Sequence, residues 1–391
     1  MPDFQRLLSS ERGMILLTSL LLLSLLLAVG LGSMTSVQNE FLIMQNLRGG
    51  MSALYLADAG VEWGKAQIDA LAGNPPVLSG ATQNFPSGTF AVTFLSAARL
   101  SPLISRIVLR STGTAGTSSQ TVQAQVSKIY DLADGALALR GNSRNTKFAG
   151  VPFQISGLDY DSSKNAPVLG SRPRAGITVD STILLNLLEN SLSSGQRSQV
   201  SGNDGRGAGI SLSDRIPGDA LDRFARDLCS APNVQVSVVP ASGALSLGDQ
   251  LWGNAGAPQL HCINGLMDAG DSVAFTGNFA GAGILVVKGA ALIASGAFHW
   301  EGLIIVTGNN VGFQTLGEQS KNIFGALMVN ETGFASGTST AILDIQGAIR
   351  ILYSRSALNA ASSLIEDSVL ATGYGWLPFY VKQDYWRSLN P

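Results

Sequence analysis

Near its start the chain carries a long apolar stretch with the pattern of one continuous helix. Residues 14–32 read MILLTSLLLLSLLLAVGLG, nineteen positions without a charged side chain. In a helix they span about 28 Å, close to the thickness of a bilayer core. Helix-compatible sequence then continues without proline to residue 73. Its apolar positions recur at helical spacing: Leu47, Leu54, Ala57, Val61 and Ile68. We predict one helix over residues 14–73, with residues 14–34 crossing a membrane.

A secretory signal peptide is the alternative interpretation of the apolar run. Small residues follow it at positions 28–33, where a signal peptidase could cut. A cleaved signal is normally followed by a released domain, whereas here the helical pattern continues beyond the apolar span. The pattern therefore favours a retained helix that runs from the membrane to the exterior.

The next segment, residues 74–130, has the alternation that is typical of strands. Three stretches show it, at residues 88–96, 105–112 and 119–130. A small antiparallel sheet and an amphipathic helix each need a partner to cover one apolar face. We therefore expect an α+β fold in which this sheet packs against the exported half of the long helix.

Beyond residue 131, short apolar runs flanked by glycine repeat along the chain. Residues 283–289 (GILVVKG) align with residues 302–308 (GLIIVTG) nineteen positions later, and residues 325–330 (GALMVN) follow after twenty-three more. Periods near twenty predict a glycine-rich β-solenoid over residues 131–353, in which glycines turn corners and aliphatic residues stack between coils. A β-sandwich with glycine-rich hairpins would show similar runs.

Helical patterns interrupt this region and an aromatic tail follows it. Residues 180–194, with Asp180 as candidate N-cap, and residues 217–230, starting at Pro217, predict a helical insertion at about residues 178–230. The tail, residues 354–391, contains Tyr374, Trp376, Phe379, Tyr380, Tyr385 and Trp386. Such clusters are typical of protein interfaces. We expect the tail to cover the open end of the solenoid, a role that is compatible with an interface.

The two cysteines, Cys229 and Cys262, lie thirty-three residues apart. Outside the cytoplasm an even pair is best interpreted as a disulfide. In the chain-entropy model such a bond contributes about 3 to 4 kcal/mol. Two buried free thiols are the alternative.

Composition and motifs indicate a scaffold without chemistry of its own. Hydrophobic residues make up 45% of the 391 positions and charged residues 13%, which excludes a disordered polyelectrolyte. A net charge of -2 leaves no positive excess to hold a nucleic acid. Asp159 and Asp161 alternate as calcium ligands do, but Lys164 stands where an EF-hand loop needs glycine. Without a P-loop, G-x-S-x-G or H-E-x-x-H motif, we expect no enzyme, no cofactor and no metal.

Both ends of the predicted helix resemble a known family. Arg12 and Gly13, followed by Met14 and the apolar run, resemble the processing site of type IV prepilins, where a peptidase cuts after the glycine and methylates the new N-terminal residue. Residues 45–68 (QNLRGGMSALYLADAGVEWGKAQI) are similar to PilX-type minor pilins, with an asparagine-leucine-arginine turn and an A-[ED]-A-G segment. The matching residues are Asn46, Leu47, Arg48, Ala57, Asp58, Ala59 and Gly60. The resemblance covers residues 6 to about 70 and implies that residues 1–13 are a leader.

Thr18 departs from the family pattern. Most pilins have glutamate at the fifth mature position, which pairs with the N-terminal ammonium of a neighbour, and that position here is Thr18. A buried ammonium without a carboxylate partner is costly. Some minor pilins and the K-type pseudopilin of type II secretion share this absence, so the resemblance implies a position at or near the fibre tip. Drift in a protein that is only anchored is the alternative.

The resemblance implies a non-enzymatic minor pilin that takes part in type IV pilus assembly in a priming complex. It would be a single-pass protein of a bacterial inner membrane with its C-terminal part periplasmic, later extracted to the pilus and cell surface. Implied partners are other minor pilins and the major pilin through the helix, the prepilin peptidase and a tip adhesin. A K-like minor pseudopilin of type II secretion is the close variant. An anchored surface β-solenoid adhesin that does not polymerise is the second class.

Overall fold

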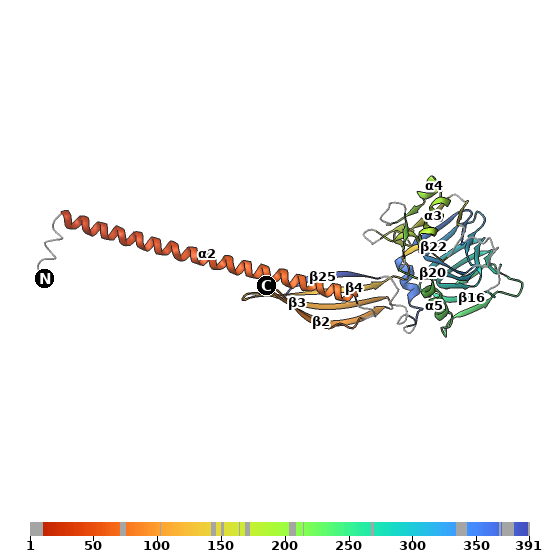
Figure 1. Cartoon of the computed structure of the whole chain (residues 1–391), viewed down its shortest axis with the longest axis horizontal. Coiled ribbons are helices and arrows are strands. Elements are labelled where there is room, and N and C mark those ends of the chain that lie inside the picture. The colour runs from red at the N-terminus through yellow and green to blue at the C-terminus, as the bar shows by residue number, and fades with distance from the viewer. Residues whose placement is uncertain are drawn as a thin grey trace.

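A computed structural model describes residues 11–70, 76–101, 103–141, 146–149, 152–163, 165–168, 173–202, 209–213, 215–266, 270–333, 342–366, 369 and 379–389. It shows an α+β molecule: one long apolar helix near the N-terminus, then a mostly β chain (Figure 1).

The predicted helix is present as α2, Glu11–Ala70. Its 60 residues span about 90 Å at 1.5 Å per residue. Its first half projects away from the rest of the molecule, and its second half lies along an antiparallel sheet (Figure 1). In that second half Ala53, Ala57, Val61 and Ile68 are fully buried, because they form the stripe that faces the sheet.

In the described part of the chain, the antiparallel sheet has five strands in the order β1-β2-β3-β4-β25. They are β1 (Ala81–Phe85), β2 (Gly88–Ser101), β3 (Ile104–Ala115), β4 (Ser118–Tyr130) and β25 (Phe379–Ser388). The three predicted stretches fall on β2, β3 and β4. Alternate residues of these strands, such as Ile107, Leu109, Val122, Ala124 and Val126, form one apolar cluster with α2.

Strand β25 corrects the expectation for the aromatic tail. The tail was expected to cover the end of the repeat region, but Phe379–Ser388 pairs with β4 instead, from Phe379 opposite Tyr130 to Ser388 opposite Val122. The physical reason is that β4 would otherwise leave its main-chain groups unpaired along a long edge. The chain between β4 and β25 is therefore an insertion into this sheet.

The inserted region contains short, mostly parallel strands. They are β5 (Gly135–Gly141), β6 (Thr146–Phe148), β7 (Phe153–Ser156), β8 (Tyr160–Asp161), β9 (Ala166–Pro167), β10 (Ala175–Val179), β11 (Val200–Ser201), β12 (Ile210–Leu212), β13 (Gln235–Val238), β14 (Ala244–Leu247), β15 (Gln250–Trp252), β16 (Gln259–Asn264), β17 (Ser272–Phe275), β18 (Asn278–Lys288), β19 (Ala291–Ala294), β20 (Ala297–Asn309), β21 (Phe313–Thr315), β22 (Lys321–Gly333), β23 (Leu343–Ile345) and β24 (Ile349–Tyr353). The chain alternates between two parallel sheets, one running β11-β7-β24-β22-β20-β18-β16-β13 and the other β14-β17-β19-β21-β23-β6. Within the described residues neither sheet closes into a barrel.

Equivalent positions of the sequence repeat lie opposite one another in neighbouring strands of this region. Gly283 of β18 lies opposite Gly302 of β20, which lies opposite Gly325 of β22. Their φ angles are 125°, 133° and 137°, in the region that favours glycine. A Cβ on Gly302 or Gly325 would collide with the carbonyl oxygen of the glycine below it. Each long strand bends there, so that β22 pairs with β24 before the bend and with β5 after it.

The first strands of the insertion stack on its last ones. Strands β5, β6 and β7 pair with β22, β23 and β24, respectively. The chain therefore leaves the insertion beside the place where it entered. Tyr353 Oη, at the end of β24, donates a 3.1 Å hydrogen bond to Asp131 Oδ1 just after β4. Arg174 and Arg355 form ion pairs with the same buried carboxylate, which fixes the junction between insertion and sheet.

Among the described residues, four helices accompany the insertion: α3 (Thr182–Ser191), α4 (Ser194–Arg197), α5 (Gly218–Cys229) and α6 (Arg355–Ser362). The predicted helices correspond to α3 and α5, and Pro217 is the N-cap residue of α5. The N-cap of α3 is Ser181, whose side chain accepts from Leu184 N, so the assignment of Asp180 was wrong. Asp180 instead accepts a 2.7 Å hydrogen bond from Gly141 N through Oδ2.

Candidate assembly surface

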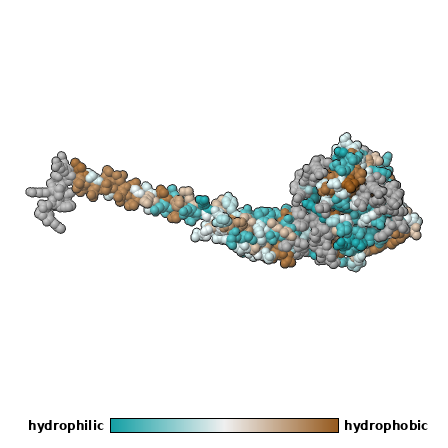
Figure 2. Space-filling view, in the orientation of Figure 1, coloured by the Kyte–Doolittle hydropathy of each residue, from teal (hydrophilic) through white to brown (hydrophobic). Residues whose placement is uncertain are grey.

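The projecting half of α2 is the largest exposed apolar surface of the described chain. Every side chain from residue 14 to residue 48 is exposed. Its large apolar residues keep 50 to 69% of their surface accessible, from Leu17 at the low end to Leu16 and Leu20 at the high end. Figure 2 shows the start of this half as predominantly hydrophobic and the part nearer the sheet as a mixture of hydrophobic and hydrophilic residues. A helix that is apolar on all sides needs lipid or other helices around it. It is long and apolar enough to cross a membrane once.

Five hydroxyl side chains within this half, those of Thr18, Ser19, Ser24, Ser33 and Thr35, donate hydrogen bonds to carbonyl oxygens of the helix itself. Thr18 Oγ1 lies 3.0 Å from the carbonyl oxygens of both Met14 and Ile15. Ser24 Oγ donates to Leu21 O at 2.8 Å, and Ser33 Oγ to Val29 O at 2.9 Å. Such internal hydrogen bonds let hydroxyl side chains stand in lipid or between helices at little cost.

The residues predicted to form a processing site lie at the start of this helix. Arg12, Gly13 and Met14 fall within α2, and Met14 is exposed. The side chains of residues 11–13 and the whole of residues 1–10 lie outside the described part of the chain.

The alanine-glycine segment positions α2 on the sheet of its own chain. Ala57 is fully buried, and a Cβ on Gly60 would collide with Ser111 Oγ and lie 3.0 Å from a Phe90 ring carbon. On the sheet side, a Cβ on Gly113 would collide with the main chain of α2 at Ala53. The small residues therefore allow helix and strands to approach closely.

The other matching residues of the family pattern face outward. Asn46, Leu47, Arg48, Asp58 and Ala59 are all exposed. Asn46 and Leu47 border a groove of about 530 Å³ where α2 leaves the sheet. The groove is completed by Ile43, Gly50, Met51, Leu54, Gln120 and Ser388. Its mostly apolar lining continues the exposed rod into the body of the molecule.

The described tail aromatics contact their own chain. Trp386 Nε1 donates a 3.1 Å hydrogen bond to Asp58 Oδ1 of α2, and Tyr385 Oη accepts one from Gln123 Nε2 at 3.3 Å. Both rings keep about two fifths of their surface exposed, at 40% and 39%. Phe379 and Tyr380 belong to β25, but their side chains are outside the described part, as are Tyr374 and Trp376 altogether.

The two cysteines are brought together in the insertion. Cys229 at the end of α5 and Cys262 of β16 form a disulfide, with their Cα atoms 5.6 Å apart. The bond ties α5 to the parallel sheet, where Leu221, Phe224 and Leu228 of the same helix are also buried.

Two buried basic side chains, Lys128 and His261, make packing and hydrogen-bond contacts within the fold. Lys128 of β4 is fully buried, and its Nζ donates to Ile68 O in the last turn of α2 at 2.8 Å, where a cation suits the helix dipole. Burial lowers the pKa of Lys128 to about 8, although Asp69 acts in the opposite direction. His261 stacks on Trp252 with ring centroids 4.1 Å apart, and burial lowers its pKa to about 4.

The carboxylates considered as calcium ligands are engaged within the chain. Asp159 accepts hydrogen bonds from Arg355 N and Nη1 at 2.8 and 2.9 Å. Asp161 Oδ1 accepts one from Ser163 Oγ at 2.6 Å. In the part of the chain that the structure describes, no group of three or more His, Cys, Asp or Glu side chains could hold a metal ion.

Comparisons with known proteins give a structural likeness but no sequence match. No protein-family model matches the chain, and no curated protein is similar to it. The crystal structure of the competence-associated pilin ComZ from Thermus thermophilus is similar at 14% sequence identity and a TM-score of 0.28. The match covers 87% of this chain and 97% of that one. At this TM-score the superposition does not establish a common fold.

Proposed function

We propose that this protein is a non-enzymatic minor pilin, similar to the PilX type, that takes part in the assembly of a type IV pilus. It is inserted in a bacterial inner membrane with its C-terminal part periplasmic. A prepilin peptidase removes residues 1–13 and methylates Met14. It is then extracted to the pilus and cell surface. Its partners are other minor pilins, the major pilin and a tip adhesin.

The observation that carries this proposal is the division of α2 into two halves. The second half packs on a sheet through Ala57, Gly60 and Val61, whereas the first half has no covering within the described chain. A removable signal sequence has no need of rigid continuity with a folded domain. A subunit that moves from lipid into a bundle of helices needs a continuous helix between its apolar half and its folded domain. The same apolar half is then buried first by lipid and later by neighbouring helices.

Thr18 supports a position at or near the fibre tip. Its hydroxyl is used by its own helix and it carries no carboxylate for the ammonium of a neighbour. A subunit with threonine at this position fits best where the N-terminal ammonium of a neighbouring subunit does not pack against residue 18. The bulky insertion at the opposite end of the rod from the free half of α2 is compatible with such a place (Figure 1).

The inserted region fits a β-solenoid over residues 131–353 with a helical insertion at about residues 178–230. Successive passes of the chain add one strand to each of the two parallel sheets, with glycines at the bends. Because it enters and leaves beside the same ionic junction at Asp131, the solenoid is carried by the pilin-like sheet as one appendage.

Fractionation of surface fibres tests the proposal. Tagged wild type, Gly13→Val and Gly30→Val are expressed in cells that assemble pili, and fibres are sheared off and purified. Gly30 is the matched control, since it lies in the same apolar helix with open space around it. We expect wild type and Gly30→Val in the fibre fraction and Gly13→Val in the membrane. Equal recovery of all three in the membrane would favour the anchored adhesin.

A further inference from the structure

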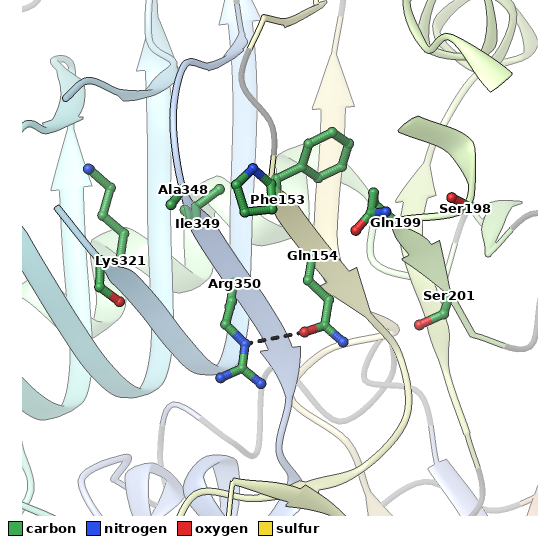
Figure 3. Close-up of a pocket in the computed structure, with 11 residues that line it drawn as sticks. Phe153, Gln154, Ser198, Gln199, Ser201, Lys321, Ala348, Ile349 and Arg350 are labelled. Atoms are coloured by element: carbon green, nitrogen blue, oxygen red, sulfur yellow. Dashed lines mark hydrogen bonds between the residues drawn. The ribbon is translucent and has the colours of Figure 1, made fainter. Parts of the chain in front are cut away.

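A groove with several polar side chains in its walls lies in the inserted region. Its volume is about 290 Å³, and its walls come from the first residues of β22, β24 and β7 and from the chain around β11 (Figure 3). The polar side chains that line it include Gln154, Ser198, Gln199, Ser201, Lys321 and Arg350.

Arg350 is held in position by a chain of hydrogen bonds. Its Nε donates to Gln154 Oε1 at 3.2 Å, as Figure 3 shows, and Gln154 Nε2 donates to Tyr160 Oη at 3.2 Å. Tyr160 is itself buried against Phe324 and Leu352. The plane of the guanidinium is therefore fixed, and its Nη1 and Nη2 edge carries no hydrogen bond to another described residue. Such an edge matches a carboxylate with two parallel hydrogen bonds.

The charged side chains among the described lining residues are both cations, Arg350 and Lys321. Lys321 is the second cation in its wall; it is 1% exposed and its Nζ donates to Gly317 O at 3.2 Å and Gln319 O at 2.8 Å. No carboxylate is among the described lining residues. The remaining polar groups are serine hydroxyls and glutamine amides, which pair with hydroxyl groups as readily as with one another.

We propose that this groove binds an acidic sugar, with the sugar carboxylate on Arg350 and its ring hydroxyls on the neighbouring serine and glutamine side chains. The volume lies just below the usual range of small-molecule pockets, about 300 to 1,000 Å³, which suits a single ring. A peptide strand is not accommodated, because β24 is paired on both sides, with β22 and β7, and offers no free edge. The site is independent of leader processing and would let a surface-exposed subunit attach to acidic polysaccharide.

Binding measurements on the full-length protein in detergent micelles test this inference. Glucuronate, galacturonate and N-acetylneuraminate are titrated by calorimetry and by saturation-transfer NMR, with glucose, acetate and inorganic phosphate as comparison ligands. The variants are Arg350→Gln, Gln154→Glu and Arg223→Gln. Arg223 is the matched control, since its side chain is 64% exposed on α5, outside the groove. Circular dichroism and thermal melts verify that each variant is folded.

We expect at least one acidic sugar to bind with a Kd near the millimolar range and glucose at least tenfold more weakly. Arg350→Gln should weaken binding by about tenfold or more, because a hydrogen-bonded charge pair is lost. Gln154→Glu should weaken it as well, since its carboxylate would occupy Arg350, and Arg223→Gln should bind as wild type does. The inference is overturned if no acidic sugar saturates the wild type or if glucose binds equally well. It is also overturned if phosphate or acetate binds as tightly as the sugars, or if Arg350→Gln leaves the affinity unchanged.

Discussion

Trp386 Nε1 donates a 3.1 Å hydrogen bond to Asp58 Oδ1, joining the last strand to the first helix across 328 positions of sequence. The contact lies on the outer edge of the antiparallel sheet, where β25 completes the pairing of β4. It shows that the second half of α2 and β25 belong to one structural unit and that everything between β4 and β25 is inserted into it.

Removing the Trp386 hydrogen bond should loosen the unit slightly. We expect Trp386→Phe to lower the free energy of unfolding by about 1 kcal/mol or less, because both partners are partly solvated. Urea denaturation followed by circular dichroism measures the change. Asp58→Asn keeps an acceptor and should cost less than Asp58→Ala. Equal losses for the two Asp58 variants would show that the hydrogen bond contributes nothing.

Gly60 should not tolerate a larger side chain. Gly60→Val forces atoms into the space of Ser111, Phe90 and Val92, and overpacking of this kind costs about 1 to 3 kcal/mol. Ala59→Val is the matched control, because Ala59 is the neighbouring exposed position. Thermal unfolding of both variants should show a lowered Tm for Gly60→Val alone. A similar Tm for both would contradict the close approach of helix and sheet.

The disulfide should contribute measurably to the stability of the insertion. It closes a loop of 33 residues, for which the chain-entropy model gives about 3 to 4 kcal/mol. The double variant Cys229→Ala, Cys262→Ala should unfold at a lower denaturant concentration than wild type. Added reductant should destabilise the wild type and leave the double variant unaffected. Destabilisation of both by reductant would mean that the effect does not come from this bond.

Stability should fall on mild acidification because of His261. Its pKa is lowered to about 4 in the folded protein, from 6.5, so the unfolded chain takes up the proton first. The folded state therefore loses stability as pH falls from about 6.5 to 4, by at most about 3 kcal/mol. His261→Phe, which keeps a ring against Trp252, should flatten this part of the pH profile. Equal profiles for wild type and His261→Phe would refute the assignment.

Local periodicity was enough to predict the helix and three strands of the antiparallel sheet. Their apolar residues recur at the spacing of a helix or of a strand, and several of the same residues are buried between helix and sheet in the fold. The glycine runs that are offset by nineteen and twenty-three residues lie opposite one another in neighbouring strands, at Gly283, Gly302 and Gly325. Strand β1 gave no such signal, since four of its five residues are exposed. Strand β25 was missed because its partner lies about 250 residues away, and pairing across that distance leaves no trace in a local pattern.

The candidate surface was predicted only in part. The exposed apolar half of α2 followed from composition, but the roles of the matching residues did not. Ala57 and Gly60 pack on the sheet, whereas Asp58 binds the tail through Trp386. The groove at Arg350 was not predicted either, because its residues come from separate strands that only the parallel register brings together.

The N-terminal mass of the protein isolated from its native membranes tests the central claim most directly. If α2 is a pilin helix, intact-mass and peptide analysis should find a chain that begins at Met14 and carries a methyl group on its amino terminus. A chain that retains residues 1–13, or one that begins near residues 28–33, would contradict it.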